Sequence, residues 1–142
     1  MSWLPKQTVV VPIDFSEESL AAVALGREFV ANSSQLHLIH ILPPLLPAEP
    51  GFVWDTVDDS RRRINAEQAM RDRIRGTTAE GAHVRVEFGD AGREIAEFAE
   101  RLHAELIVVP SHGRSGFSRL LLGSVSERVI RLAHCPVLVL RS

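Results

Sequence analysis

Short apolar runs alternate along this chain with segments whose apolar residues recur at the spacing of an α-helix. The first run, Thr8 to Ile13, is rich in β-branched residues, and the fourth, Glu105 to Pro110, is apolar between its ends. This alternation predicts one α/β domain, 1–142, with a five-stranded parallel sheet and helices on both faces. We expect strands at 8–13, 36–42, 83–88, 105–110 and 136–140, and helices from Ser16 to about Ala31, at 58–76, at 90–104 and from Ser124 onward.

The composition is that of an ordinary soluble globular protein and excludes several classes of function. Hydrophobic content is 45%, charged content is 24% and net charge is −2, so the overall charge favours neither nucleic acid nor an anionic membrane. No apolar stretch reaches the roughly 18 residues of a membrane span, and the start of the chain does not read as a secretory signal. Cys135 is the single cysteine, which excludes an intramolecular disulfide framework. We therefore expect a cytoplasmic protein.

The basic residues are fifteen arginines and one lysine, Lys6, which precedes the first strand. A Walker A loop needs a lysine beside the phosphates, and a Schiff-base enzyme needs one in its site. A response-regulator receiver also needs a lysine across its acidic site. Lys6 is too early in the chain for any of these roles, so all three are excluded.

A glycine-bearing turn, Ser111 to Gly116, follows the fourth apolar run and leads into a helical pattern that opens with Gly123-Ser124. A turn of this kind offers backbone N–H groups to a phosphate, and a second helix start adds further free amides. In parallel sheets ligands bind beyond the C-terminal ends of the strands, where strand order reverses. If the first and fourth strands are neighbours, Asp14 and the glycine turn converge on one crevice.

Two segments carry a more specific pattern. One is Val11-Pro12-Ile13-Asp14-Phe15-Ser16. The other combines Ser111-His112-Gly113-Arg114-Ser115-Gly116, Leu122-Gly123-Ser124-Val125-Ser126-Glu127-Arg128-Val129 and Cys135-Pro136-Val137-Leu138-Val139. Together they resemble the universal stress protein family, over the whole chain in length and element order. The resemblance implies the Rossmann-like, adenine-nucleotide-binding fold of that family.

The ATP-binding branch of the family carries a glycine, two residues, a glycine, nine residues, and then glycine with serine or threonine. In this chain the second glycine is Gly113 and the final pair is Gly123-Ser124. The first glycine position is Pro110, which departs from the pattern. Proline has no N–H, so any family contact through that amide is lost. The amides from Ser111 through Ser115, and those of Ser124 and Val125, are expected to remain available.

By resemblance, ATP would bind at the C-terminal ends of the first, second and fourth strands, with Mg²⁺ accompanying the nucleotide. The adenine and ribose would be bordered by Pro12, Ile13, Asp14 and Ile41. The phosphates would be held by Ser111, His112, Gly113, Arg114, Ser115, Gly123, Ser124 and Val125. Asp14 could reach phosphate-bound Mg²⁺ through water. No catalytic residue and no resident metal site are expected.

The last apolar run, Pro136 to Leu140, has no helix after it. A bare apolar strand at a sheet edge is an aggregation hazard unless something pairs with it. Pairing with a second copy would give a two-fold homodimer, which the resemblance also implies.

Several features have a simpler structural interpretation. Ser124 with Glu127 fits a capping box, and Asp14 could cap the helix after it. His37 and His40 lie three apart on a strand, which points them to opposite faces and makes a shared metal improbable. The arginine-rich helix at 61–75 reads as a solvated face, and residues 43–57 read as a loop of lid length.

The sequence leaves three functions open. The first is a homodimeric stress-response sensor or regulator that binds ATP. The second is a family member without nucleotide binding, acting as a protein-interaction module, which Pro110 favours. The third is a very slow ATP hydrolase, for which no convincing base is found.

Overall fold

The computed structural model describes residues 2–44, 55–112 and 122–141. It contains a five-stranded parallel sheet in the order β3-β2-β1-β4-β5, which confirms the predicted fold class and makes β1 and β4 neighbours. The strands are β1 (Val9–Pro12), β2 (Leu36–Leu42), β3 (His83–Phe88), β4 (Leu106–Pro110) and β5 (Val137–Leu140). The helices are α1 (Glu17–Arg27), the short 3₁₀-helix η1 (Ser33–Gln35), α2 (Asp55–Ile74), α3 (Ala91–Arg101) and α4 (Ser124–Leu132).

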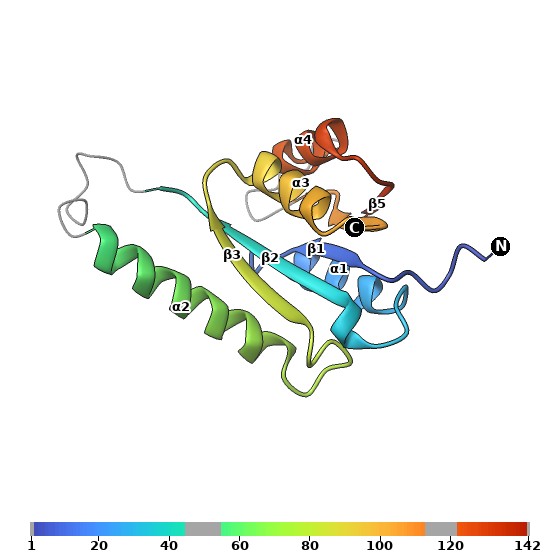
Figure 1. Ribbon diagram of the computed structural model, residues 1–142, viewed down its shortest axis with the longest axis horizontal. Coiled ribbons are helices and arrows are strands. Elements are labelled where there is room, and N and C mark those ends of the chain that lie inside the picture. Colours follow the sequence, from blue (N-terminus) through green and yellow to red (C-terminus); the bar gives the residue numbers. More distant parts are fainter. Residues whose placement is uncertain (1, 45–54, 113–121, 142) are drawn as a thin grey trace.

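Helices cover both faces of the sheet. Figure 1 shows α2 on one side and α3 with α4 on the other. On the first side, α1 and α2 pack over alternate strand residues such as Val9, Val11 and Leu38. On the second, α3 and α4 pack over the intervening residues, among them Val10 and Ile39. Two buried layers of this kind explain why the central strands are apolar on both faces rather than alternating.

Helix α1 begins as predicted and ends earlier than predicted. Ser16 is its N-cap and accepts a hydrogen bond from the N–H of Ser19 at 3.1 Å. The helix stops at Arg27 rather than near Ala31, because its last turn tightens and Phe29 donates its N–H to the carbonyl of Gly26. Val30, three residues beyond the end of the helix, forms an isolated parallel bridge with Lys6.

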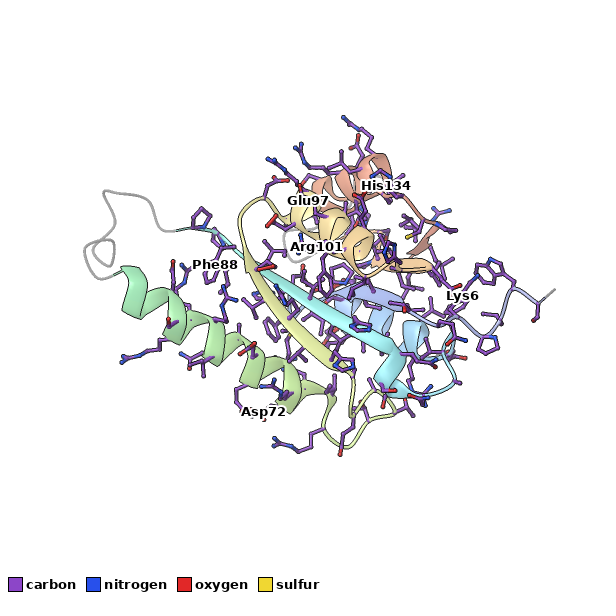
Figure 2. All side chains as sticks on the ribbon, in the orientation of Figure 1. Lys6, Asp72, Phe88, Glu97, Arg101 and His134 are labelled. Carbon is purple, nitrogen blue, oxygen red and sulfur yellow. The ribbon has the colours of Figure 1, made fainter. Side chains whose placement is uncertain are left out.

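Helix α2 begins at Asp55, three residues before the predicted start. The predicted loop, 43–57, falls for the most part on 45–54, which lie outside the described residues. Within α2, Arg62 and Arg63 place their guanidinium groups 5.4 and 5.2 Å from the ring centre of Phe88. Figure 2 places Phe88 at the end of β3 facing α2, at the opposite end of the molecule from Lys6. Part of the arginine-rich face is therefore packed on an aromatic ring rather than only solvated.

β3 and β5 form the two edges of the sheet. β3 pairs with β2 on one side, and β5 pairs with β4 from Ile107↔Val137 to Pro110↔Leu140. The four residues of β5 are all half-buried. None of the described helices combines the length and the apolar character that crossing a bilayer requires.

Candidate functional site

The C-terminal end of β1 supplies three of the predicted site residues. Its pairing with β2 runs to Pro12↔Ile39, and Ile13 continues it by donating its N–H to the carbonyl of Ile39 at 2.8 Å. The Ile13 side chain is 2% exposed and belongs to the core under α1 and α2, so only its backbone can border a ligand. Pro12 is half-buried and, by alternation, lies on the opposite face.

Asp14 follows directly and is held by the start of α1. One of its carboxylate oxygens accepts hydrogen bonds from the N–H of Ser16 at 3.0 Å and from the Ser16 hydroxyl. Its own N–H lies 3.4 Å from the Ser19 hydroxyl. Asp14 therefore does help to cap the turn into α1, the simpler of its two interpretations. Its carboxylate lies at the same edge of the sheet as the ends of β2 and β4.

The second strand contributes Ile41, the sixth residue of β2. Its side chain is half-buried and packs against the cluster under α3 and α4. By alternation it shares that face with Pro12. An apolar surface beside the end of β1 is therefore available on the side of the sheet that α3 and α4 cover.

The end of β4 differs from expectation in one respect. The N–H of Ser111 donates to the carbonyl of Leu140 at 2.8 Å, so it extends the β4–β5 pairing and is not available to a phosphate. Ser111 is 4% exposed, and its hydroxyl lies 3.4 Å from Nδ1 of the half-buried His112. The expectation that the Ser111 amide remains available was wrong, because β5 already uses it.

The start of α4 sits directly against the end of β4. Gly123 donates its N–H to the carbonyl of Ser111 at 2.6 Å and is itself the N-cap of α4. Ser124 is thus the first helical residue, so it does not form the predicted capping box, and Glu127 pairs with Arg131 instead. No side chain caps this helix start. The exposed amides of Ser124 and Val125 therefore have no partner within the helix.

Pro110 affects the pairing of β4 with β1. Ile107 and Ser111 donate their N–H groups to β5. Because backbone N–H groups alternate in direction along a strand, those of the even-numbered residues of β4 point to β1, and Pro110 occupies one of these positions. After β1, Ile13 donates its N–H to β2, so an N–H at position 12 would point to β4. Both prolines thus lack an N–H on the seam between the two strands. The pairing of β1 with β4 accordingly stops at Val10↔Ile107, although each strand continues beside its other neighbour.

Three predicted phosphate contacts, Gly113, Arg114 and Ser115, lie outside the described residues. The other nine occupy one edge of the sheet: the ends of β1, β2 and β4 and the start of α4. Among the described residues no three His, Cys, Asp or Glu side chains are grouped to hold a metal.

Two residues at this edge were missed by the sequence analysis. Ser126 is 6% exposed and donates its hydroxyl to the carbonyl of Pro110 at 2.6 Å, which ties α4 to the end of β4. His40 places Nδ1 2.6 Å from the carbonyl oxygen of Ile13. Helical spacing from Val129 would have placed Ser126 on the buried face. Nothing local in the sequence indicates the partner of His40, which lies 27 residues away.

Two titratable groups with shifted pKa values, His37 and Cys135, lie away from this edge. Burial, and secondarily the neighbouring His83, lower the pKa of His37, while burial raises the pKa of the Cys135 thiol. His37 stacks on His83 with ring centres 4.7 Å apart, whereas His40 packs on Phe15. The prediction that His37 and His40 face opposite sides of the sheet is confirmed.

Comparison with known proteins agrees with this architecture. The family model described as the universal stress protein family matches residues 6–141. Universal stress protein MJ0531 of Methanocaldococcus jannaschii is 35% identical over 140 residues, which cover 94% of this chain and 81% of that protein. Universal stress protein G of Escherichia coli O157:H7 is 32% identical over 144 residues, covering 95% and 99% of the two chains.

Solved structures give the same result. Hypothetical protein MJ0577 superposes with a TM-score of 0.79 at 25% identity, covering 98% of both chains. A universal stress protein crystallised in complex with cAMP superposes with a TM-score of 0.67 at 26% identity, covering 95% of this chain and 97% of the other. With a family match over nearly its full length and relatives above 30% identity, this chain belongs to the universal stress protein family.

Proposed function

We propose that this protein binds an adenine nucleotide, ATP in the first instance, at the edge formed by the ends of β1, β2 and β4. One observation carries the proposal: the hydrogen bond from Gly123 to Ser111 holds the uncapped start of α4 against the end of β4. Amides without a helical partner at a helix start attract anions, which suits a nucleotide's phosphates. The relative crystallised with cAMP supports an adenine nucleotide as the ligand class.

Within this proposal each group has a role. Ser124 and Val125 donate their N–H groups to phosphate, and His112, which follows Ser111 at the end of β4, is a further phosphate contact. Gly113, Arg114 and Ser115 complete the phosphate contacts. Pro12 and Ile41 offer apolar surface to the purine, and Asp14 accepts from the ribose hydroxyls. Mg²⁺ would arrive with the phosphates, since Asp14 is a single carboxylate already engaged with Ser16.

We further propose that the protein acts as a homodimer, as a sensor or regulator in the stress response. The support is β5, an edge strand of four half-buried apolar residues that would pair with its copy in a second subunit. The cytoplasm is the compartment that this role assumes, because a nucleotide sensor needs a nucleotide pool. Sedimentation velocity over micromolar concentrations tests the dimer, and a monomer throughout would contradict it.

A second candidate is a protein-interaction module that binds no nucleotide. The observation that favours it is the use of the Ser111 and Gly123 amides inside the fold, which leaves fewer donors for phosphate. The available side chains suggest slow hydrolysis at most.

The deciding experiment has two steps. The protein is purified without added nucleotide and denatured, and any released small molecule is identified by mass spectrometry. The nucleotide-free protein is then titrated calorimetrically with ATP, AMP and cAMP, with and without Mg²⁺. Bound adenine nucleotide or saturable binding supports the first candidate. A protein that releases no nucleotide, and that shows no heat of binding and no thermal shift at millimolar Mg-ATP, would contradict the first candidate and support the protein-interaction module.

A further inference from the structure

The turn that carries Asp14 has an unusual backbone conformation. Phe15, which follows Asp14, has a φ of 66°, in the left-handed region that bulky residues seldom adopt. Such a conformation persists only when its surroundings hold it, and it is often found beside functional residues. The contacts of Asp14 with Ser16 and Ser19 fix the C-terminal side of this turn. Neither of these two hydrogen bonds involves the Phe15 ring.

His40 of β2 contacts the residues on both sides of Asp14. Its Nδ1 lies 2.6 Å from the carbonyl oxygen of Ile13, in the peptide group that joins Ile13 to Asp14. Its ring packs against the Phe15 ring, with centres 4.9 Å apart and planes inclined at 61°. Arg73 lies on the Phe15 ring as well, 5.8 Å from its centre. One imidazole therefore holds the carbonyl before Asp14 and the side chain after it.

This geometry fixes the tautomer of His40. A carbonyl oxygen can only accept a hydrogen bond, so Nδ1 must carry the proton. In the neutral imidazole Nε2 is then the unprotonated nitrogen. The contact thus has a spectroscopic signature that does not depend on any ligand.

We propose that His40 is a positioning residue for the nucleotide site, which it serves by setting the backbone of Asp14 through the carbonyl of Ile13 and the ring of Phe15. This proposal rests on the proposed function, in which Asp14 contacts the bound nucleotide. A purely structural His40 would change the free energy of unfolding when replaced. It would leave the affinity of the folded protein unchanged.

The first test needs no nucleotide. Long-range ¹H–¹⁵N NMR of the wild-type protein, at about pH 8.5 where an ordinary imidazole is neutral, reports which nitrogen of each histidine is protonated. We expect His40 with its proton on Nδ1. A proton on Nε2 would mean that the contact with Ile13 is absent in solution, and the proposal would be overturned.

The second test compares nucleotide affinity in variants that remain folded by circular dichroism. His40→Asn keeps an N–H donor near the position of Nδ1, whereas His40→Phe keeps a ring and loses the donor. We expect His40→Phe to weaken ATP binding by about threefold to tenfold, the worth of one hydrogen bond, and His40→Asn to stay within about threefold of wild type. His37→Phe, the same exchange on the same strand but the opposite face, is the matched control and should bind as wild type does.

The outcomes separate the two proposals. If wild-type protein binds no adenine nucleotide, the proposed function fails and the role of His40 fails with it. If wild type binds and His40→Phe binds equally well, only the role of His40 is overturned. A loss in His40→Phe that His37→Phe reproduces also overturns it, because the effect would then not belong to the Asp14 turn.

Discussion

Pro12 and Pro110 end two neighbouring strands, and the N–H that each lacks would have faced the other strand. The pairing of β1 with β4 stops at Val10↔Ile107 for this reason, while β1 stays paired with β2 and β4 with β5. Proline at a ladder position removes one inter-strand hydrogen bond, and here two positions on the same seam are affected. The departure of Pro110 from the family's glycine thus changes the sheet at the point where strand order reverses.

Replacing Pro110 by glycine tests this interpretation. Because the N–H that Pro110 lacks would point to β1, and the Ser126 hydroxyl of α4 can still bond to the carbonyl of residue 110, we expect Pro110→Gly to change ATP affinity by less than about threefold. The free energy of unfolding should fall by about 1 kcal/mol, since glycine gives the unfolded chain more freedom. Calorimetric titration and urea unfolding measure the two quantities. Binding more than tenfold tighter would show instead that the pyrrolidine ring obstructs the ligand.

Ser126 and Ser124 should behave differently although they lie two residues apart on α4. Ser126 is buried and its hydroxyl bonds to the carbonyl of Pro110, so Ser126→Ala leaves that carbonyl without its donor. We expect a loss of about 1–2 kcal/mol in unfolding free energy. Ser124→Ala is the matched control: the residue is exposed and its hydroxyl caps nothing, so stability should stay within about 0.5 kcal/mol. Equal losses in both variants would contradict the assigned role of Ser126.

The order of elements could be predicted from the sequence because each element has a local signature. β-branched runs marked the strands, and Ser16 marked the start of α1 through its own side chain. The expectation that Asp14 and the turn after β4 converge rested on topology, and the neighbouring positions of β1 and β4 that it required are present.

Hydrogen-bond use at the candidate site could not be predicted in the same way. The Ser111 amide is taken by Leu140, whose position depends on how β5 pairs with β4. The start of α4 falls one residue earlier than a capping box requires, because Gly123 is bonded to Ser111. His40 finds its partner at the end of the neighbouring strand, β1. Each of these contacts is set by register between distant segments, which local patterns do not contain.

Gly26 allows α1 to approach the sheet closely. A Cβ at this position would lie 2.7 Å from Cγ2 of Val11 and 3.4 Å from Cδ1 of Leu36. At an open helix position alanine is more stable than glycine by about 0.5–1 kcal/mol. For Gly26→Ala we expect the opposite effect: the free energy of unfolding should fall by about 1–3 kcal/mol because of overpacking, as measured by urea unfolding.

A double-mutant cycle with Val11→Ala identifies the clash. Because the added methyl group meets the Val11 side chain, the double variant should be less destabilised than the sum of the two single variants. Additive losses would mean that α1 is held away from β1 by another contact.

The stability of the fold should decrease in mild acid because of His37. Its pKa is lowered in the folded protein, first by burial and then by the stacked His83. The unfolded chain, with a histidine pKa of about 6.5, therefore binds a proton before the folded chain does. The stability that neutral His37 contributes is fully present above the pKa of the unfolded chain. It is lost as the pH falls toward and through the lower pKa of the folded protein. Urea midpoints at about pH 7.5 and about pH 5.5 should differ, and His37→Phe should reduce the difference.

The control for this measurement is His103→Asn. His103 is exposed, and asparagine accepts its φ of 54° more readily than most residues. This variant should keep the full dependence on pH that wild type shows. If His103→Asn flattens the dependence and His37→Phe does not, the acid sensitivity arises elsewhere than in the stacked pair between β2 and β3.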